Sequence, residues 1–96
     1  MKTRIAKLVP PHMDKHWSFQ MVNPTEEEVS LIRAAFHTTA VQAAKPFLQG
    51  CTKDWLMVEF WTYSKDEVDA AGAHLFNLVS LPVREGDFTR AELGLE

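Results

Sequence analysis

The sequence has one cysteine, four scattered glycines and no long apolar run, and each shortage excludes a class of protein. Cys51 alone cannot form an internal disulfide, which fits a reducing compartment. No glycine-rich phosphate loop, serine nucleophile elbow or paired-carboxylate motif is present, so a binding protein is favoured over an enzyme. No apolar stretch could span a bilayer, and the N-terminus lacks the apolar core of a signal peptide. We therefore expect a cytoplasmic protein.

An excess of positive charge is also missing. Lysine and arginine number 10 against 13 aspartates and glutamates, which gives a net charge of -3. This balance provides no basic surface for nucleic acid or for an anionic membrane, and we expect neither as a partner. His12 and His16 have the spacing of metal ligands only if they lie on a helix, and the two prolines before them favour a loop. We expect no metal and no cofactor.

The chain is long enough for one domain and apolar enough to pack it. Of its 96 residues, 46% are hydrophobic, which predicts a folded core rather than a disordered chain. A single domain of this size buries a modest fraction of its surface and is marginally stable alone. Association with a second copy would add buried surface, so a homodimer is a reasonable expectation.

The most informative stretch runs from Trp55 to Tyr63. Its composition is β-prone, and side chains alternate across a strand. One side would carry the core residues Leu56, Val58 and Phe60. A strand that is apolar on both faces is normally covered on both, and a chain this short has few elements left to cover the second face. Either the C-terminal tail or the N-terminal hairpin folds over that face, or the face stays open as a binding surface. That second face consists of Trp55, Met57, Glu59, Trp61 and Tyr63.

Flanking patterns predict the remaining elements. Alternation predicts strands over residues 3–9 and 16–22, paired as a hairpin with the first at an edge. Thr25 to Glu28 has the pattern of a capping box, so a helix should begin there and continue to about residue 44, with a last turn through Phe47 and Leu48 before Gly50. A central strand from about 54 to 63 leads into a second capping box at Ser64 to Glu67 and a helix that ends near Leu81.

These elements predict a small single α+β domain over residues 1–96, in the order β-β-α-β-α. Two amphipathic helices would pack on one face of an antiparallel or mixed sheet. Residues 83–96 would form a loosely ordered tail, with either a short strand near Val83 or a helical turn around Ala91. A strand followed by a capped helix is similar to units of ferredoxin-like folds and dimeric α/β barrels, but the strand order is incomplete for either and no family follows.

Three functional hypotheses follow from these patterns. The first is a protein-interaction or regulatory module that self-associates through Trp55, Met57, Glu59, Trp61 and Tyr63, because aromatic residues and methionine are enriched in interfaces. The second is a small-molecule binder or small enzyme whose pocket is lined by the same face. The third is an acidic inhibitor whose helix start, Glu26 to Glu28, docks on a basic partner. For Glu59 itself, we expect a cross-strand ion pair with Lys7 or Arg4, or else a role in ligand binding.

Overall fold

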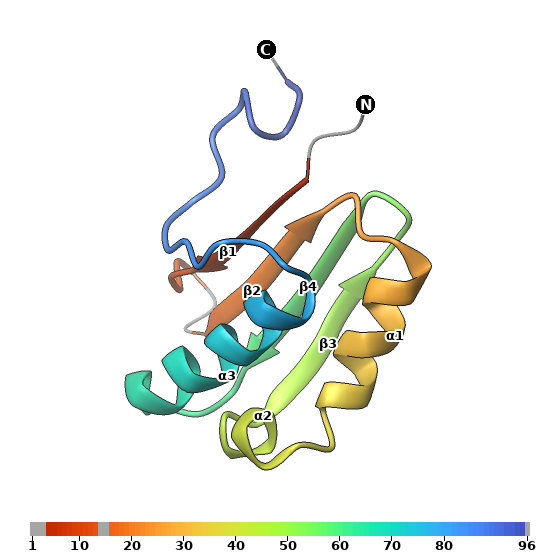
Figure 1. Ribbon diagram of the computed structural model, residues 1–96. Helices are drawn as coiled ribbons and strands as arrows, with labels where there is room; N and C mark the ends of the chain where they lie inside the picture. The colour runs from red at the N-terminus through yellow and green to blue at the C-terminus, as the bar shows by residue number, and fades with distance from the viewer. Residues whose placement is uncertain (1–3, 14–15, 96) are drawn as a thin grey trace.

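The computed structural model describes residues 4–13 and 16–95 and shows an α+β domain built on one four-stranded sheet. Every strand pairing in the sheet is antiparallel, in the order β1-β2-β4-β3 (Figure 1). The second strands of two hairpins therefore pair with each other at the centre. The strands are β1 (Ile5–Val9), β2 (Trp17–Val22), β3 (Pro46–Cys51) and β4 (Trp55–Phe60).

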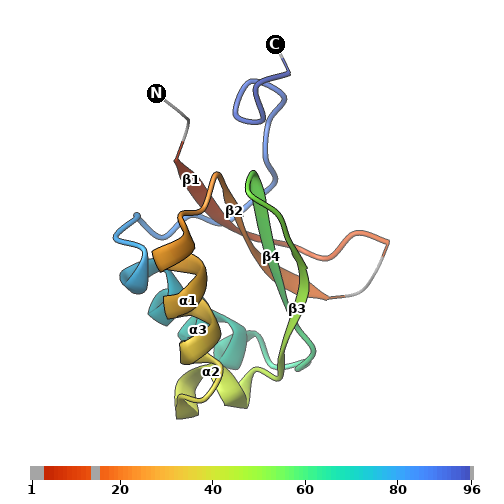
Figure 2. The same ribbon diagram turned by 90° about the vertical axis from the view of Figure 1, so that its right-hand side faces the viewer.

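The helices all lie against one face of this sheet, as Figure 2 shows. They are α1 (Glu26–Ala35), α2 (Thr39–Ala43) and α3 (Lys65–Leu78). The predicted fold class is confirmed, since helices are segregated to one side of an antiparallel sheet. The order of elements differs from the prediction by an additional strand and by a break in the first helix.

The core lies between the helices and the sheet. Alternate residues of the two central strands point into it, including Phe19 and Met21 on β2 and Leu56 and Val58 on β4, all fully buried. Phe76 of α3 packs edge-on against Phe19, with ring centroids 5.1 Å apart. The predicted inward face of the central strand is therefore correct.

The hairpin of β1 and β2 is confirmed, with β1 at the edge of the sheet. The start of α1 is also as predicted. Thr25 Oγ1 accepts from Glu28 N–H at 3.1 Å, and the Glu28 carboxylate accepts from Thr25 N–H at 2.9 Å. Glu28 additionally pairs with Arg4, which precedes β1. One carboxylate thus closes the capping box and connects the helix to the sheet.

The prediction of one continuous helix to about residue 44 is wrong, because the helix breaks after Ala35. Thr38 has an extended backbone, with φ at -82° and ψ at 149°. Its hydroxyl donates to Ala35 O at 2.6 Å. A threonine that bonds back to the preceding turn competes with the helical backbone, so Thr38 ends one helix and precedes the next.

Residues 46–51 form strand β3 rather than the end of that helix, which is a second correction. Trp61 N–H donates to Lys45 O at 3.0 Å, so the carbonyl group of Lys45 points toward the chain that follows β4. Backbone groups of successive residues point to opposite sides of a strand, so those of Pro46 point toward the free edge of the sheet. Pro46 suits that position because an edge strand does not need its missing N–H. Phe47 is consequently on the sheet, opposite Glu59.

Strand β4 ends at Phe60, so the predicted extension to Tyr63 is wrong by three residues. Helix α3 then begins at Lys65 with Ser64 as its cap. The predicted second capping box forms only in part: Ser64 Oγ accepts from Glu67 N–H at 3.3 Å, while Ser64 N–H donates to Thr62 Oγ1 at 3.1 Å. The Thr62 hydroxyl therefore accepts the hydrogen bond from Ser64 N–H that the Glu67 carboxylate was expected to accept.

The chain after α3 runs along the outer edge of β1 and is ordered by specific contacts. Leu8 N–H donates to Arg84 O at 2.8 Å, and Gly86 N–H donates to Leu8 O at 3.0 Å. A turn follows, in which Leu93 N–H donates to Thr89 O at 3.1 Å. Residues 83–95 form neither a strand nor a helix: Glu85 makes an isolated bridge to Leu8, and residues 90–94 form a turn, so the expected short strand or helical turn is reduced to these local contacts.

Candidate functional site

The face of the sheet that the helices leave uncovered is the candidate site, and we call it the open face. The strand register defines it, since Lys7 lies opposite Gln20, and Gln20 lies opposite Met57. These residues alternate with those of the core, so they point to the other side. Its members are Ile5, Lys7 and Val9 on β1, Ser18, Gln20 and Val22 on β2, Trp55, Met57 and Glu59 on β4, and Phe47 on β3.

One half of the open face is covered by the chain's own C-terminal segment (residues 83–95). The Phe88 ring packs on Trp55, with centroids 5.3 Å apart. Val9 and Val22 are each 8% exposed although neither belongs to the core cluster, which agrees with cover from this side. Trp55, a predicted site residue, is therefore partly buried within its own chain.

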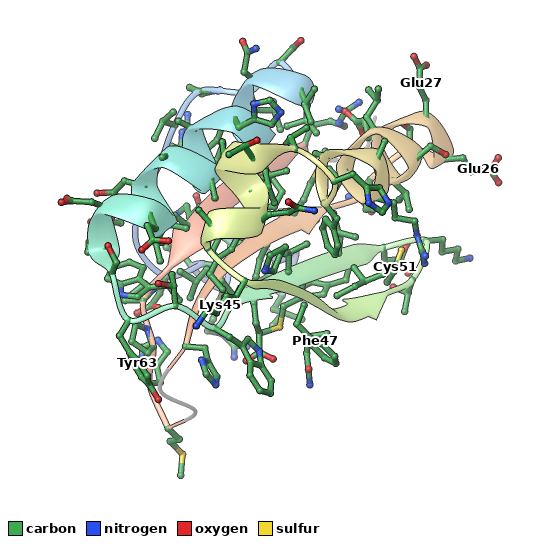
Figure 3. All side chains as sticks on the ribbon, turned by 90° about the horizontal axis from the view of Figure 1, so that it is seen from below. Glu26, Glu27, Lys45, Phe47, Cys51 and Tyr63 are labelled. Atoms are coloured by element: carbon green, nitrogen blue, oxygen red, sulfur yellow. The ribbon has the colours of Figure 1, made fainter. Side chains whose placement is uncertain are left out.

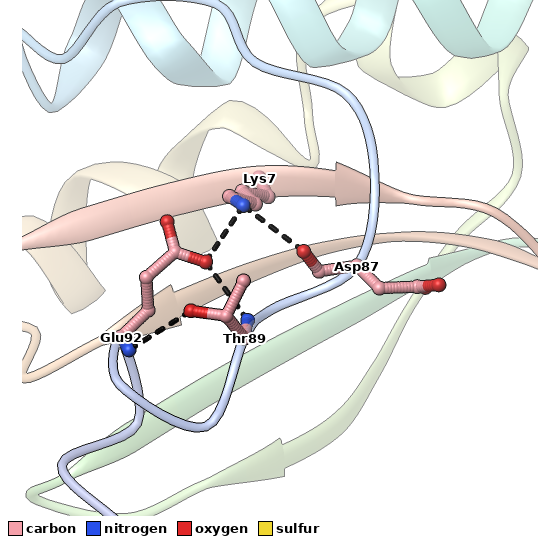
Figure 4. A network of polar contacts seen from close by, with 4 residues as sticks. All are labelled: Lys7, Asp87, Thr89 and Glu92. Carbon is pink, nitrogen blue, oxygen red and sulfur yellow. Dashed lines mark hydrogen bonds and ion pairs between the residues drawn. The ribbon is translucent and has the colours of Figure 1, made fainter. Parts of the chain in front are cut away.

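Lys7 anchors that segment through a small polar network (Figure 4). Its ammonium group donates to Asp87 O at 2.9 Å and to Glu92 Oε1 at 2.8 Å. Glu92 also accepts from Thr89 N–H at 2.9 Å. The hydrogen bond from Lys7 is the main cause that lowers the pKa of the Glu92 carboxyl below its ordinary value. Each of these contacts favours the charged carboxylate.

The other half of the open face carries the aromatic patch, which we define as Phe47, Met57, Glu59 and Trp61. Phe47 is 48% exposed and Trp61 is 49% exposed. Their rings are tilted against each other at a centroid distance of 5.6 Å. His16 stacks on Trp61, with centroids 4.8 Å apart and planes within 11° of parallel. Two large rings thus stay half exposed side by side, which is unusual for a small domain.

Glu59 is the polar member of the patch and is only 6% exposed. The predicted ion pair with Lys7 or Arg4 is wrong, because Lys7 bonds Glu92 and Arg4 pairs with Glu28. Among residues 4–13 and 16–95, no lysine, arginine or histidine nitrogen lies within 4.0 Å of its carboxylate. Covering this carboxylate without a cation would be costly, and a partner that brings a cation would avoid that cost.

The structure distributes the predicted site residues over three surroundings. Met57, Glu59 and Trp61 lie together in the aromatic patch, and Trp55 lies beneath Phe88. Tyr63 follows the end of β4 and is 94% exposed. Figure 3 shows Tyr63 and Phe47 on the side of the sheet away from the helices. Tyr63 therefore adjoins the candidate surface as a rim residue rather than as a member of the strand face.

Sequence reasoning missed two contributors to the patch, Phe47 and His16. The sequence predicts a helical turn at Phe47, and residues 46–51 do not alternate apolar with polar side chains. The alternation of half-buried and exposed side chains along Pro46–Cys51 is visible only in the structure. The stacking of His16 on Trp61 had no sequence signal, since it depends on how the two hairpins meet in the sheet.

Two hollows in the described surface lie away from the aromatic patch. A small one of about 60 Å³ has Arg4 and Arg84 in its wall. A wider one of about 430 Å³ lies between the start of α1 and the β3–β4 turn, and contains the exposed Cys51. None of the five predicted site residues lines either hollow, so the small-molecule hypothesis gains no support from them. The wider hollow is lined by Pro24, Glu26, Val29, Ser30, Cys51, Thr52 and Lys53.

The acidic helix start is partly used for folding. Glu28 is 9% exposed and engaged with Thr25 and Arg4, while Glu26 and Glu27 are exposed. Only two of the three glutamates therefore remain for a basic partner.

The described residues show neither a cluster of metal ligands nor a membrane-spanning helix. Within the described ranges, no three side chains of histidine, cysteine, aspartate or glutamate come close enough together to hold a metal ion. No helix in that part of the chain has both the length and the apolar character needed to cross a bilayer. The aromatic patch itself offers apolar contact, ring stacking and a carboxylate.

Similarity to other proteins adds nothing to this description, because no family model, no curated protein and no solved structure matches the chain.

Proposed function

We propose that this protein is a small interaction module that associates with a second copy of itself through the aromatic patch. One observation carries the proposal: Phe47 and Trp61 remain half exposed beside a nearly buried Glu59, on the face that neither the helices nor the C-terminal segment covers. Aromatic residues and methionine are the types enriched at the centre of protein interfaces. Tyr63 forms the rim of the proposed surface, and a cytoplasmic location, suggested by the lone Cys51, belongs to the same proposal.

The expected association is weak. Half-exposed Phe47 and Trp61 together offer roughly 200 Å² of ring surface per copy, given 150–250 Å² for each aromatic side chain. Burying it contributes roughly 5 kcal/mol per copy at about 25 cal/mol per Å². Two copies contribute roughly 10 kcal/mol, against an association cost of about 4–15 kcal/mol. A dissociation constant of roughly tens of micromolar or weaker is therefore expected.

The size of the face leads to the same conclusion. Four strands about 4.8 Å apart and about 20 Å long present roughly 400 Å² of sheet, part of which the C-terminal segment already covers. A standard interface takes about 800 Å² from each partner. The proposed dimer is consequently smaller than a permanent one and should exchange with monomer as the concentration changes.

Sedimentation equilibrium over a range of about 5 μM to 1 mM tests the proposal. The wild type should change from monomer to dimer within this range, and Trp61→Ala should remain monomeric to higher concentration. Leu31→Ala is the matched control, because Leu31 is an exposed apolar residue, 38% exposed, on α1 and not on the open face. A wild type that stays monomeric throughout, or a Leu31 variant that weakens association as much as the Trp61 variant, would refute the proposal.

A further inference from the structure

We infer that, in the dimer, Lys45 of each copy binds Glu59 of the other. This inference rests on the proposed self-association and adds the polar contact that would orient the two copies. It starts from two opposite charges at the same end of the sheet, neither of which has a partner of opposite charge within the described part of its own chain.

Glu59 is the residue that would need a cation in the dimer. It is 6% exposed and lies on β4, two residues after Met57 and two residues before Trp61, opposite Phe47 on β3. In the described part of the chain, no buried side-chain oxygen lacks a hydrogen-bond partner, and Glu59 makes no such bond, so its carboxylate oxygens still contact solvent. A second copy that covered the patch would remove this water. Burying the carboxylate without a cation would then oppose association.

Lys45 supplies the cation. It is exposed and directly precedes β3, and in projection it lies between Tyr63 and Phe47 in Figure 3. Its φ of 54° is in the left-handed region, where glycine would be favoured and a lysine is uncommon. Its ammonium group remains more than 4.0 Å from the carboxylate of its own Glu59, since no such ion pair forms.

Symmetry brings the two charges together across a dimer. A backbone hydrogen bond joins Lys45 to Trp61, and Glu59 comes two residues before Trp61. Lys45 and Glu59 are therefore diagonal neighbours across the two strands, with backbones about 7–8 Å apart. In an isologous dimer, a twofold axis through this patch places each residue close to its neighbour's symmetry mate. The long, flexible lysine stem can cover the remaining distance. Each dimer would then contain two identical Lys45–Glu59 contacts.

Charge exchange tests the pairing by sedimentation equilibrium. Lys45→Glu alone should weaken association about tenfold or more, because it places two carboxylates against each other. Glu59→Lys alone should do the same. An equimolar mixture of the two variants should recover association as a mixed dimer, since each copy then has only one sign of charge at the contact. Lys53→Glu is the control, because Lys53 is an exposed lysine beyond the far end of β3.

The outcomes separate the inference from the proposed function. If Lys45→Glu associates as strongly as the wild type while Trp61→Ala does not, the pairing is wrong and the interface stands. If the wild type never dimerises, both are wrong. Circular dichroism and urea unfolding should confirm that each variant is folded. Should Glu59→Lys not fold, Lys45→Glu still decides, because Lys45 is exposed: weakening well beyond that of Lys53→Glu supports the pairing, and equal weakening overturns it.

Discussion

Removing the Glu28 carboxylate should destabilise the protein far more than removing either glutamate beside it. Glu28 accepts from Thr25 N–H at 2.9 Å and pairs with Arg4, and it is 9% exposed. Glu28→Ala loses the returning half of the capping box, worth about 1 kcal/mol. It also loses an ion pair whose arginine side chain is 41% exposed, so this contact is discounted to about 0.5–1 kcal/mol.

The expected total is a loss of about 1.5–2 kcal/mol in the free energy of unfolding, measured by urea titration at neutral pH. For a domain of this length, that loss corresponds to a drop of roughly 8–15 °C in Tm. Glu26→Ala and Glu27→Ala are matched controls within the same helical turn. Both residues are exposed, so their removal should change stability little.

A double-mutant cycle with Arg4→Ala would isolate the ion pair from the cap. If Glu27→Ala costs as much as Glu28→Ala, the stabilisation comes from the helix dipole rather than from the specific contacts of Glu28. In that case the structural reasoning is refuted.

Three further predictions concern the core, α3 and the C-terminal segment. Phe19→Ala should cost about 3–5 kcal/mol in urea unfolding, because Phe19 is fully buried; a loss below about 1 kcal/mol would contradict its central position. Gly72→Ala should raise stability by about 0.5–1 kcal/mol and raise Tm, since a new Cβ would lie an ordinary 3.5 Å from Leu8; a loss would mean that the contact is too close. Glu92→Gln should destabilise the protein at neutral pH, because the contact with Lys7 lowers the pKa of the Glu92 carboxyl in the folded protein. The difference from wild type should begin to shrink as pH falls below the ordinary value of 4.5, and should be lost as pH passes through the lowered pKa of the folded state. A difference that does not shrink at all between neutral pH and the most acidic pH at which both proteins stay folded would show that Lys7 does not hold the charged Glu92 carboxylate.

The strengths and failures of the sequence predictions have physical causes. The start of α1 and the inward face of β4 were predictable because capping and alternation are local signals. Strand β3 was not, because six residues that begin with proline and contain a bulge have little strand preference of their own. They become a strand by pairing with β4, which is a tertiary effect.

The candidate site also has one part that the sequence predicts and another that depends on tertiary contacts. Sequence placed Met57, Glu59 and Trp61 on one surface, and they are there. It left open whether the C-terminal tail would fold over this surface, and it could not indicate that Phe88 packs on Trp55, or that Lys7 is engaged by Glu92 and so is unavailable to Glu59. Contacts between residues about 30 to 85 positions apart depend on how the C-terminal segment crosses the sheet, and no local pattern encodes that path.

The sequence by itself determined that one short chain forms a helix-backed sheet with more apolar strand surface than its helices can cover, because periodicity and capping are properties of neighbouring residues. Only the tertiary structure decided which part of that surface stays accessible. The C-terminal segment covers Trp55 because Lys7 anchors it, while Phe47 and Trp61 remain half exposed even though His16 stacks on Trp61. The physical reason is that strand alternation assigns a residue to a face, whereas exposure depends on which distant segments are packed over that face.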